Sequence, residues 1–225
     1  IVCDKTTEDV PDSVAMAPKN NHEYYNGAQY NACYYEVTQC ADGYTPKSGV
    51  APACNPKTYD VTFYKFAGSD EVVDTVQCTF DSQQCMMPSV DALVRPGYVV
   101  VPKWCDANGK CYDANVNTEQ NISATGDNIA LYAQWESDVF EVQLVATDAD
   151  ENAAQGPIYL KYNVGWFADA NATQSFEGLV NLPGKDNGSY VFAGYKIGEK
   201  QIIDMNGAIL AGTNTVVTDD APATV

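Results

Sequence analysis

The chain has 225 residues, of which 45% are hydrophobic, so it can bury one large core or several small ones. Its 30 acidic residues outnumber 12 basic ones, and the resulting net charge of −18 repels nucleic acids and anionic membranes. We therefore expect no nucleic-acid partner. Since no run approaches the roughly 18 apolar residues of a membrane helix, we also expect no membrane span in this segment.

Residues 1–57 form the first region that the sequence distinguishes, a cysteine-rich segment. Its stretch "CADGYTPKSGVAPAC" is a cysteine-bounded loop rich in turn residues. The preceding stretch, "HEYYNGAQYNACYYE" at 22–36, is densely aromatic. Alternation within "YNACYYEV" favours a strand pair that packs on the following region, and a ligand-binding surface is the alternative. The residues of that alternative surface are Tyr24, Tyr25, Tyr30, Tyr34 and Tyr35.

Residues 58–137 are predicted to form a set of short strands separated by turns. The expected strands are "YDVTFYKF" (59–66), "TVQCTF" (75–80), "GYVVVPKW" (97–104) and "NIALYAQW" (128–135). In the last of these, Leu131 and Trp135 share one face, which we expect to be core. The Asn-Gly turn in "DANGK" indicates a hairpin.

Residues 138–225 repeat the pattern. The expected strands are "VFEVQLVAT" (139–147), "IYLKYNVGWF" (158–167), "SYVFAGYKI" (189–197) and "NTVVT" (214–218). The stretch "NGSYVFAGYK" parallels "RPGYVVVPKW" of the first set, which indicates an internal repeat. The closing stretch "TGDNIALYAQW" has no second copy, so we expect the second unit to be truncated at its C-terminal end. The fold class is therefore mainly β, in small units.

All eight cysteines lie within the first 111 residues, and no CxxC pair occurs. Zinc sites built on cysteine usually contain such pairs, so disulfides are the favoured interpretation and reduced thiols the alternative. Disulfides indicate an oxidising compartment, which predicts an extracellular or cell-surface protein.

Spacing favours particular disulfide pairs, although eight cysteines allow 105 pairings. The stretch "CTFDSQQC" places Cys78 and Cys85 on either side of a short turn, and "CDANGKC" does the same for Cys105 and Cys111. Closing an eight-residue loop contributes about 2.5 kcal/mol in the chain-entropy description. The remaining expected pairs are Cys40 with Cys54 and Cys3 with Cys33.

Several motifs of residues 58–220 resemble the Listeria–Bacteroides repeat, also called the internalin-type B repeat. "LYAQW" matches the closing motif of that family, "RPGY" stands at its Arg-x-Gly-Tyr position and "MMP" at its Leu-Pro-like turn. "KYNVGWF" and "YVFAGYKIGEKQIIDMNGAIL" are similar to a second, diverged copy. The resemblance implies tandem β-grasp-like modules at 58–137 and 138–225.

The same resemblance implies a secreted or surface-anchored bacterial protein. We expect a non-enzymatic repeat region that acts as a spacer, stalk or adhesion module. The alternative is a ligand-binding module that recognises a glycan or a host or cell-surface protein through exposed aromatic side chains.

Catalytic candidates are few. A Ser–His–Asp or Cys–His site needs a histidine base, and the one histidine, His22, lies in the polar stretch "KNNHEYYNG". The chain contains no P-loop, HExxH or GxGxxG motif. Two carboxylates would suffice for a glycosidase, but with 30 acids no pair stands out. We therefore expect no enzyme and no cofactor.

Two further motifs invite a functional interpretation. In "DADEN", Asp148, Asp150 and Asn152 alternate like the start of a calcium loop, but the glycine and glutamate that complete such a loop are missing, so we expect a solvated turn and no metal site. Three sequons, "NIS" (121–123), "NAT" (171–173) and "NGS" (187–189), are interpreted as turn sequences.

Overall fold

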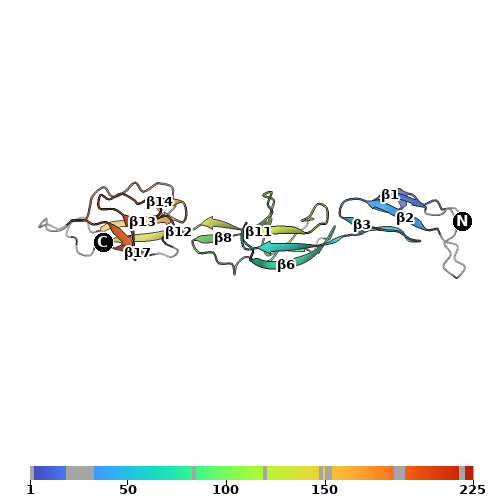
Figure 1. Cartoon of the computed structure of the whole chain (residues 1–225), viewed down its shortest axis with the longest axis horizontal. Helices are drawn as coiled ribbons and strands as arrows, with labels where there is room; N and C mark the ends of the chain where they lie inside the picture. The colour runs from blue at the N-terminus through green and yellow to red at the C-terminus, as the bar shows by residue number, and fades with distance from the viewer. Residues whose placement is uncertain are drawn as a thin grey trace. The chain divides into compact units, whose positions relative to one another are not determined.

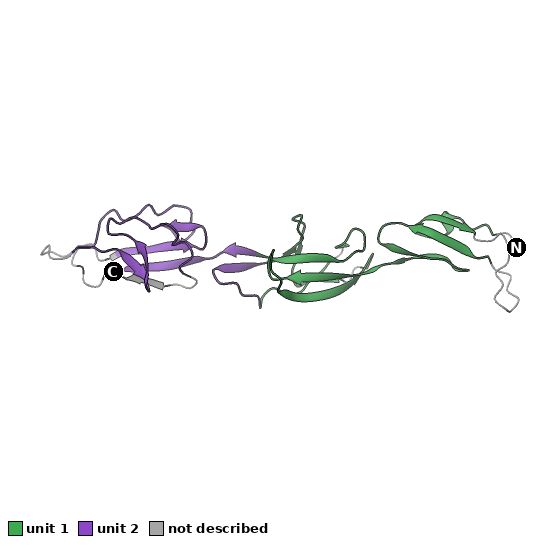
Figure 2. Cartoon of the chain, in the orientation of Figure 1, with its two compact units in different colours: residues 1–92, 102–134 green, residues 93–101, 135–225 purple. Residues whose placement is uncertain are grey.

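A computed structural model describes residues 3–18, 33–82, 85–118, 121–146, 149, 154–184, 191–217 and 221–224. Within these residues the chain forms strands and turns, with no α-helix and one 3-10 turn, η1 (Thr7–Asp9) (Figure 1). This confirms the mainly β class. The chain divides into two compact units, Ile1–Ala92 with Pro102–Gln134, and Leu93–Val101 with Trp135–Val225 (Figure 2).

The cysteine-rich segment contains two small antiparallel strand pairs. They are β1 (Ser13–Pro18) with β2 (Tyr35–Cys40), and β3 (Tyr44–Lys47) with β4 (Ala53–Pro56). Alternation along β2 buries Tyr35 and Val37, and Val10 is buried in the same segment. The expected strand at "YNACYYEV" thus begins at Tyr35.

A five-stranded sheet follows. Its strands are β5 (Thr58–Tyr64), β6 (Val72–Thr79), β8 (Tyr98–Cys105), β9 (Cys111–Asp113) and β11 (Ile129–Ser137). Their order across the sheet is β6-β5-β11-β8-β9, and β5 and β11 are parallel. The hairpin partners β6 and β9 are antiparallel to β5 and β8, respectively. A short pair, β7 (Cys85–Met86) with β10 (Asn117–Thr118), completes the region.

The core of this sheet follows from strand alternation. Tyr59, Val61 and Phe63 on β5 are buried, while the residues between them are partly exposed. Trp104 is fully buried, meets the Phe63 ring edge-on at 4.8 Å, and donates from Nε1 to the Pro88 carbonyl at 2.8 Å. Leu131 is also fully buried, as predicted for its face of the strand.

Trp135, the predicted core partner of Leu131, is only partly buried. Ala133, which lies between Leu131 and Trp135 on the same face, is buried, at 2% exposure.

The second sheet has six strands. They are β12 (Val139–Val145), β13 (Ala154–Lys161), β14 (Gly165–Phe167), β15 (Tyr195–Ile197), β16 (Lys200–Ile203) and β17 (Ala221–Thr224). Their order is β14-β13-β12-β17-β15-β16, and β12 and β17 are parallel. The neighbouring strands β13-β12-β17-β15-β16 are arranged as β6-β5-β11-β8-β9 are in the first sheet. The second sheet has one further strand, β14, which pairs with β13.

Three sequence-based expectations for this second region need correction. The predicted strand 158–167 is a hairpin, because residues 162–164 turn and Asn163 has a φ of 57°. The predicted strand at 214–218 is a turn over its described residues 214–217, beside Thr213, whose hydroxyl bonds Leu210 O and Trp166 Nε1. The predicted strand at 189–197 is irregular over 191–194 and becomes a strand only at Tyr195. β17, which no sequence pattern predicted, pairs with β12 in parallel as β11 pairs with β5.

Four disulfides join Cys3 to Cys33, Cys40 to Cys54, Cys78 to Cys85 and Cys105 to Cys111. Three of them are the pairs that spacing favoured, and Cys3–Cys33 is the pair that was left over. Four disulfides indicate an oxidising environment. Within the described residues, no helix has the length and apolar character that crossing a membrane requires.

Candidate functional site

The predicted tyrosine surface is described in part. Tyr24, Tyr25 and Tyr30 lie outside the described residues. Tyr35 is 3% exposed, and its hydroxyl accepts a hydrogen bond from Lys5 N at 3.2 Å, so it is a core residue and cannot contribute to an exposed surface. Tyr34 is partly buried.

A different aromatic pair lies on the partly exposed face of the first sheet. Tyr64 and Tyr132 are register partners across the parallel strands β5 and β11. Their rings stack at 5.6 Å with an interplanar angle of 26°. Alternation along residues 128–135 places Tyr132 on the face opposite Leu131, but no sequence pattern linked Tyr132 to Tyr64.

The sequence offered one histidine and one calcium-loop-like stretch, which was expected to be a solvated turn. His22, Asp148, Asp150 and Asn152 lie outside the described residues. Among the residues that are described, no three His, Cys, Asp or Glu side chains gather closely enough to hold a metal ion.

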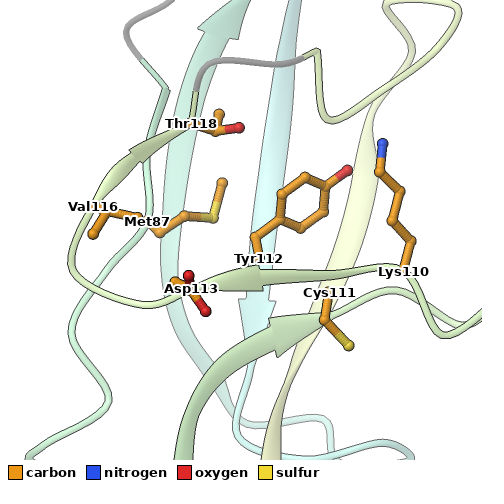
Figure 3. A pocket seen from close by; sticks show the side chains of 7 residues that line it. All are labelled: Met87, Lys110, Cys111, Tyr112, Asp113, Val116 and Thr118. Atoms are coloured by element: carbon orange, nitrogen blue, oxygen red, sulfur yellow. The ribbon is translucent and has the colours of Figure 1, made fainter.

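A hollow of about 260 Å³ lies beside the hairpin that Cys105 and Cys111 close. Figure 3 shows the Tyr112 ring and the Met87 side chain facing one another across it, with Lys110 beside the ring. Its lining residues are Met87, Lys110, Cys111, Tyr112, Asp113, Val116 and Thr118. The volume is below the range of about 300–1,000 Å³ that is typical of small-molecule sites.

The lining of this hollow includes one aromatic ring, one ammonium group and one carboxylate. The Lys110 ammonium lies 5.2 Å from the centre of the Tyr112 ring, a cation–π distance. The Tyr112 hydroxyl already donates to the Ile122 carbonyl at 3.3 Å. Asp113 is the single carboxylate in the lining, so the paired carboxylates of a glycosidase do not meet there.

A polar contact joins the cysteine-rich segment to the first sheet. The Tyr44 hydroxyl donates to the Asp81 carboxylate, which also accepts from Asn121 Nδ2 at 2.9 Å. The Asn121 carbonyl oxygen accepts from Asp81 N at 2.8 Å. The Phe80 ring packs edge-on against Tyr44 at 5.4 Å and lies over Gly43. Sequence reasoning missed this contact, because its members come from three distant segments.

The Tyr44–Asp81 hydrogen bond shifts both pKa values. It is the main cause that raises the Tyr44 pKa to about 12, and it is the main cause that lowers the Asp81 pKa. Asp127 also has a lowered pKa, first because it accepts from the Thr125 hydroxyl and second because Lys57 is close.

Turn-capping lowers the pKa of two further carboxylates. Asp169 accepts from Gln174 N, its largest contribution, and from Thr173. Asp204 accepts from Ala208 N, again the largest contribution, and from Asn206 N. A general acid needs a raised pKa, so these carboxylates serve as ionised turn-holding groups.

Comparison with known proteins adds no relative. No protein-family profile matches the chain, and a search of curated proteins finds no match.

Proposed function

We propose that the chain is a non-enzymatic, extracellular repeat region of a bacterial surface protein, and that its modules act as spacers. The observation that carries this proposal is the pairing of the first and last strands of each sheet, β5 with β11 and β12 with β17, as parallel neighbours. Because parallel strands run in one direction, the chain enters each sheet at one end and leaves at the other. A module of this kind advances the chain by its own length.

The advance can be estimated from the strands. β5 has 7 residues and β11 has 9. At about 3.3 Å per residue, one module carries the chain forward by roughly 25–30 Å. A hairpin-based module with antiparallel terminal strands would return the chain to its starting end, so this topology suits a spacer.

The shared strand order supports the β-grasp-like assignment. In both sheets two hairpins flank the last strand. They are β5–β6 and β8–β9 around β11 in the first sheet, and β12–β13 and β15–β16 around β17 in the second. The two copies at 58–137 and 138–225 then stand as tandem modules of the Listeria–Bacteroides type behind the cysteine-rich segment 1–57. The four disulfides suit an exposed setting outside the cytoplasm.

A ligand-binding module is the second candidate function. The stacked pair Tyr64 and Tyr132 offers partly exposed aromatic surface of the kind on which sugars stack. Host or cell-surface glycans and proteins are the partners that this function would involve.

Solution scattering and a glycan array together separate the two functions. A spacer predicts a radius of gyration well above the ~17 Å of a compact chain of this length, and no bound glycan. A glycan that binds the native chain and not the Tyr64→Ala/Tyr132→Ala double variant would favour the binding module. A compact radius of gyration would overturn the spacer.

A further inference from the structure

Two described sequons differ sharply in their surroundings, although their sequences offer the same groups. Both place an asparagine two residues before a hydroxyl side chain, at Asn121 with Ser123 and at Asn171 with Thr173. Both also have an acid two positions before the asparagine, Glu119 and Asp169. N-x-Ser/Thr is the acceptor sequence for N-linked glycans, so accessibility decides whether either can be used.

The sequon at Asn121 begins with a partly buried asparagine and continues into two buried residues. The Asn121 side chain is held on both sides by Asp81, as donor to its carboxylate and acceptor from its backbone. Ile122 and Ser123 are 4% and 6% exposed, and the Ser123 hydroxyl accepts from Asp127 N at 3.0 Å. Because Asn121 is hydrogen-bonded on both sides and the next two residues are buried, its modification would require these contacts to open.

The sequon at Asn171 lies at the tip of the turn that follows β14. Asn171 and Thr173 are exposed. Asp169 holds the turn through the backbone, since its carboxylate accepts from Asn171 N at 3.0 Å and from Thr173 N at 3.1 Å. The Asn171 side-chain amide makes no hydrogen bond to any described residue, so modifying it breaks no contact there.

We propose that Asn171 is an N-glycosylation site and that Asn121 is not. The donor would be an oligosaccharide carried on a polyprenyl pyrophosphate. The Asn171 amide nitrogen would form a bond to the anomeric carbon of the first sugar and lose a proton. The bond from that carbon to the pyrophosphate oxygen would break, and the polyprenyl pyrophosphate would leave.

A glycan at this position would stand on the outside of the second sheet's β14 turn. It would add bulk and solubility without disturbing the buried cluster that includes Trp166 on β14.

The test is enzymatic glycosylation of the purified, folded 225-residue chain with a bacterial oligosaccharyltransferase and its lipid-linked donor. All samples carry Asn187→Gln, which removes the third sequon, and peptide mapping by mass spectrometry locates the glycan. We expect occupancy at Asn171 to exceed that at Asn121 by at least about tenfold, because Asn121 requires local opening. Asn171→Gln should abolish the modification of the folded chain.

The same chain, reduced, alkylated and denatured, is the internal control. Here both sequons should be modified, because the structure that hides Asn121 has gone. An unmodified Asn171 in the folded chain, under conditions in which the denatured chain is modified there, would overturn the proposal. Comparable occupancy at Asn121 and Asn171 in the folded chain would overturn it as well.

Discussion

The two sheets share a strand order but differ in what fastens it. The first sheet contains two local disulfides, Cys78–Cys85 and Cys105–Cys111. The second contains none, since no cysteine follows Cys111 in the sequence. It is held by one contiguous apolar cluster, whose buried members are Phe140, Val142, Leu144, Ala146, Ile158, Leu160, Trp166, Phe192, Tyr195, Ile202, Ile203 and Val217.

The difference can be seen at one pair of equivalent positions in the two sheets. Cys105 and Cys111 are register partners at the β8–β9 hairpin, with Cα atoms 4.0 Å apart. The corresponding partners at the β15–β16 hairpin are Ile197 and Lys200. The same hairpin is thus covalently closed in one sheet and not in the other. Strand order therefore depends on the hairpins and the parallel central pair, and the disulfides add stability to a small domain.

Removal of the disulfides should change stability most, and only in the first sheet. Replacing Cys78 and Cys85 by alanine should cost the first sheet about 2.5 kcal/mol of unfolding free energy, because the unfolded chain regains its loop entropy. The same loss is expected for Cys105 and Cys111. Hydrogen exchange read by mass spectrometry should show lost protection in β5–β11 and unchanged protection in β12–β16. Equal losses in both sheets would mean that the two fold as one cooperative unit.

A glycine under an aromatic ring is a feature that both units share. Gly43 (φ 86°) lies under Phe80, and Gly97 (φ 81°) lies under Tyr162, each ring within 2.6 Å of where a Cβ would be. Alanine at either position should cost about 2 kcal/mol, from the left-handed backbone and the displaced ring. Gly109→Ala is the matched control, since Gly109 has a φ of 86° and open space around it. If Gly109→Ala lowered the unfolding free energy as much as the other two substitutions, the ring contacts would contribute nothing to their cost.

Replacement of Tyr195 should instead raise stability, and only in the second sheet. Its hydroxyl is buried and makes no hydrogen bond to a described residue, and burial raises its pKa. Tyr195→Phe should therefore stabilise the second sheet by about 1 kcal/mol, because an unpaired buried polar group is removed. Chemical denaturation should show a higher midpoint with an unchanged slope. Tyr112→Phe, which removes a bonded hydroxyl from the first sheet, should not stabilise it.

The smallest expected effect is a local pH dependence at Tyr44. Because the Asp81 pKa is lowered in the folded chain, the stability that its carboxylate contributes is present above the ordinary pKa of 3.8 and is lost in more acidic solution. Because the Tyr44 pKa is raised in the folded chain, the stability that its hydroxyl contributes is present below pH 10.0 and is lost as the pH rises towards about 12. Amide exchange around residues 43–47 should accelerate at both extremes. Tyr44→Phe should remove the alkaline change, and an alkaline change that persists would refute this origin.

Regular alternation of large residues made part of the fold predictable. β5 and β11 were expected because apolar and polar residues alternate along them, and β8 because it is rich in valine and aromatic residues. The hairpin at Asp106 was expected from its Asn-Gly turn. β17 was missed because Ala-Pro-Ala-Thr carries no such pattern, and its place depends on pairing with β12. Alternation predicts a strand only where side chains differ enough to mark two faces.

The surface features were harder to anticipate for the same physical reason. The hollow joins Met87 to Tyr112, and the polar contact joins Tyr44 to Asp81 and Asn121. Each set comes together only when distant strands are assembled, and no local pattern encodes that meeting. The disulfides could be anticipated because three of the four pairs are close in sequence, with separations of 14, 7 and 6.

Single-molecule pulling tests the spacer most directly, with handles at Thr58 and at the C-terminal end of the chain. Each parallel terminal pair would then be loaded along its strands, so we predict two resolved unfolding steps. Reduction should lengthen one step by about 35 Å, as the loops held by Cys78–Cys85 and Cys105–Cys111 are released, and leave the other unchanged. If the chain extended without resolved unfolding steps, this result would contradict the proposed spacer function.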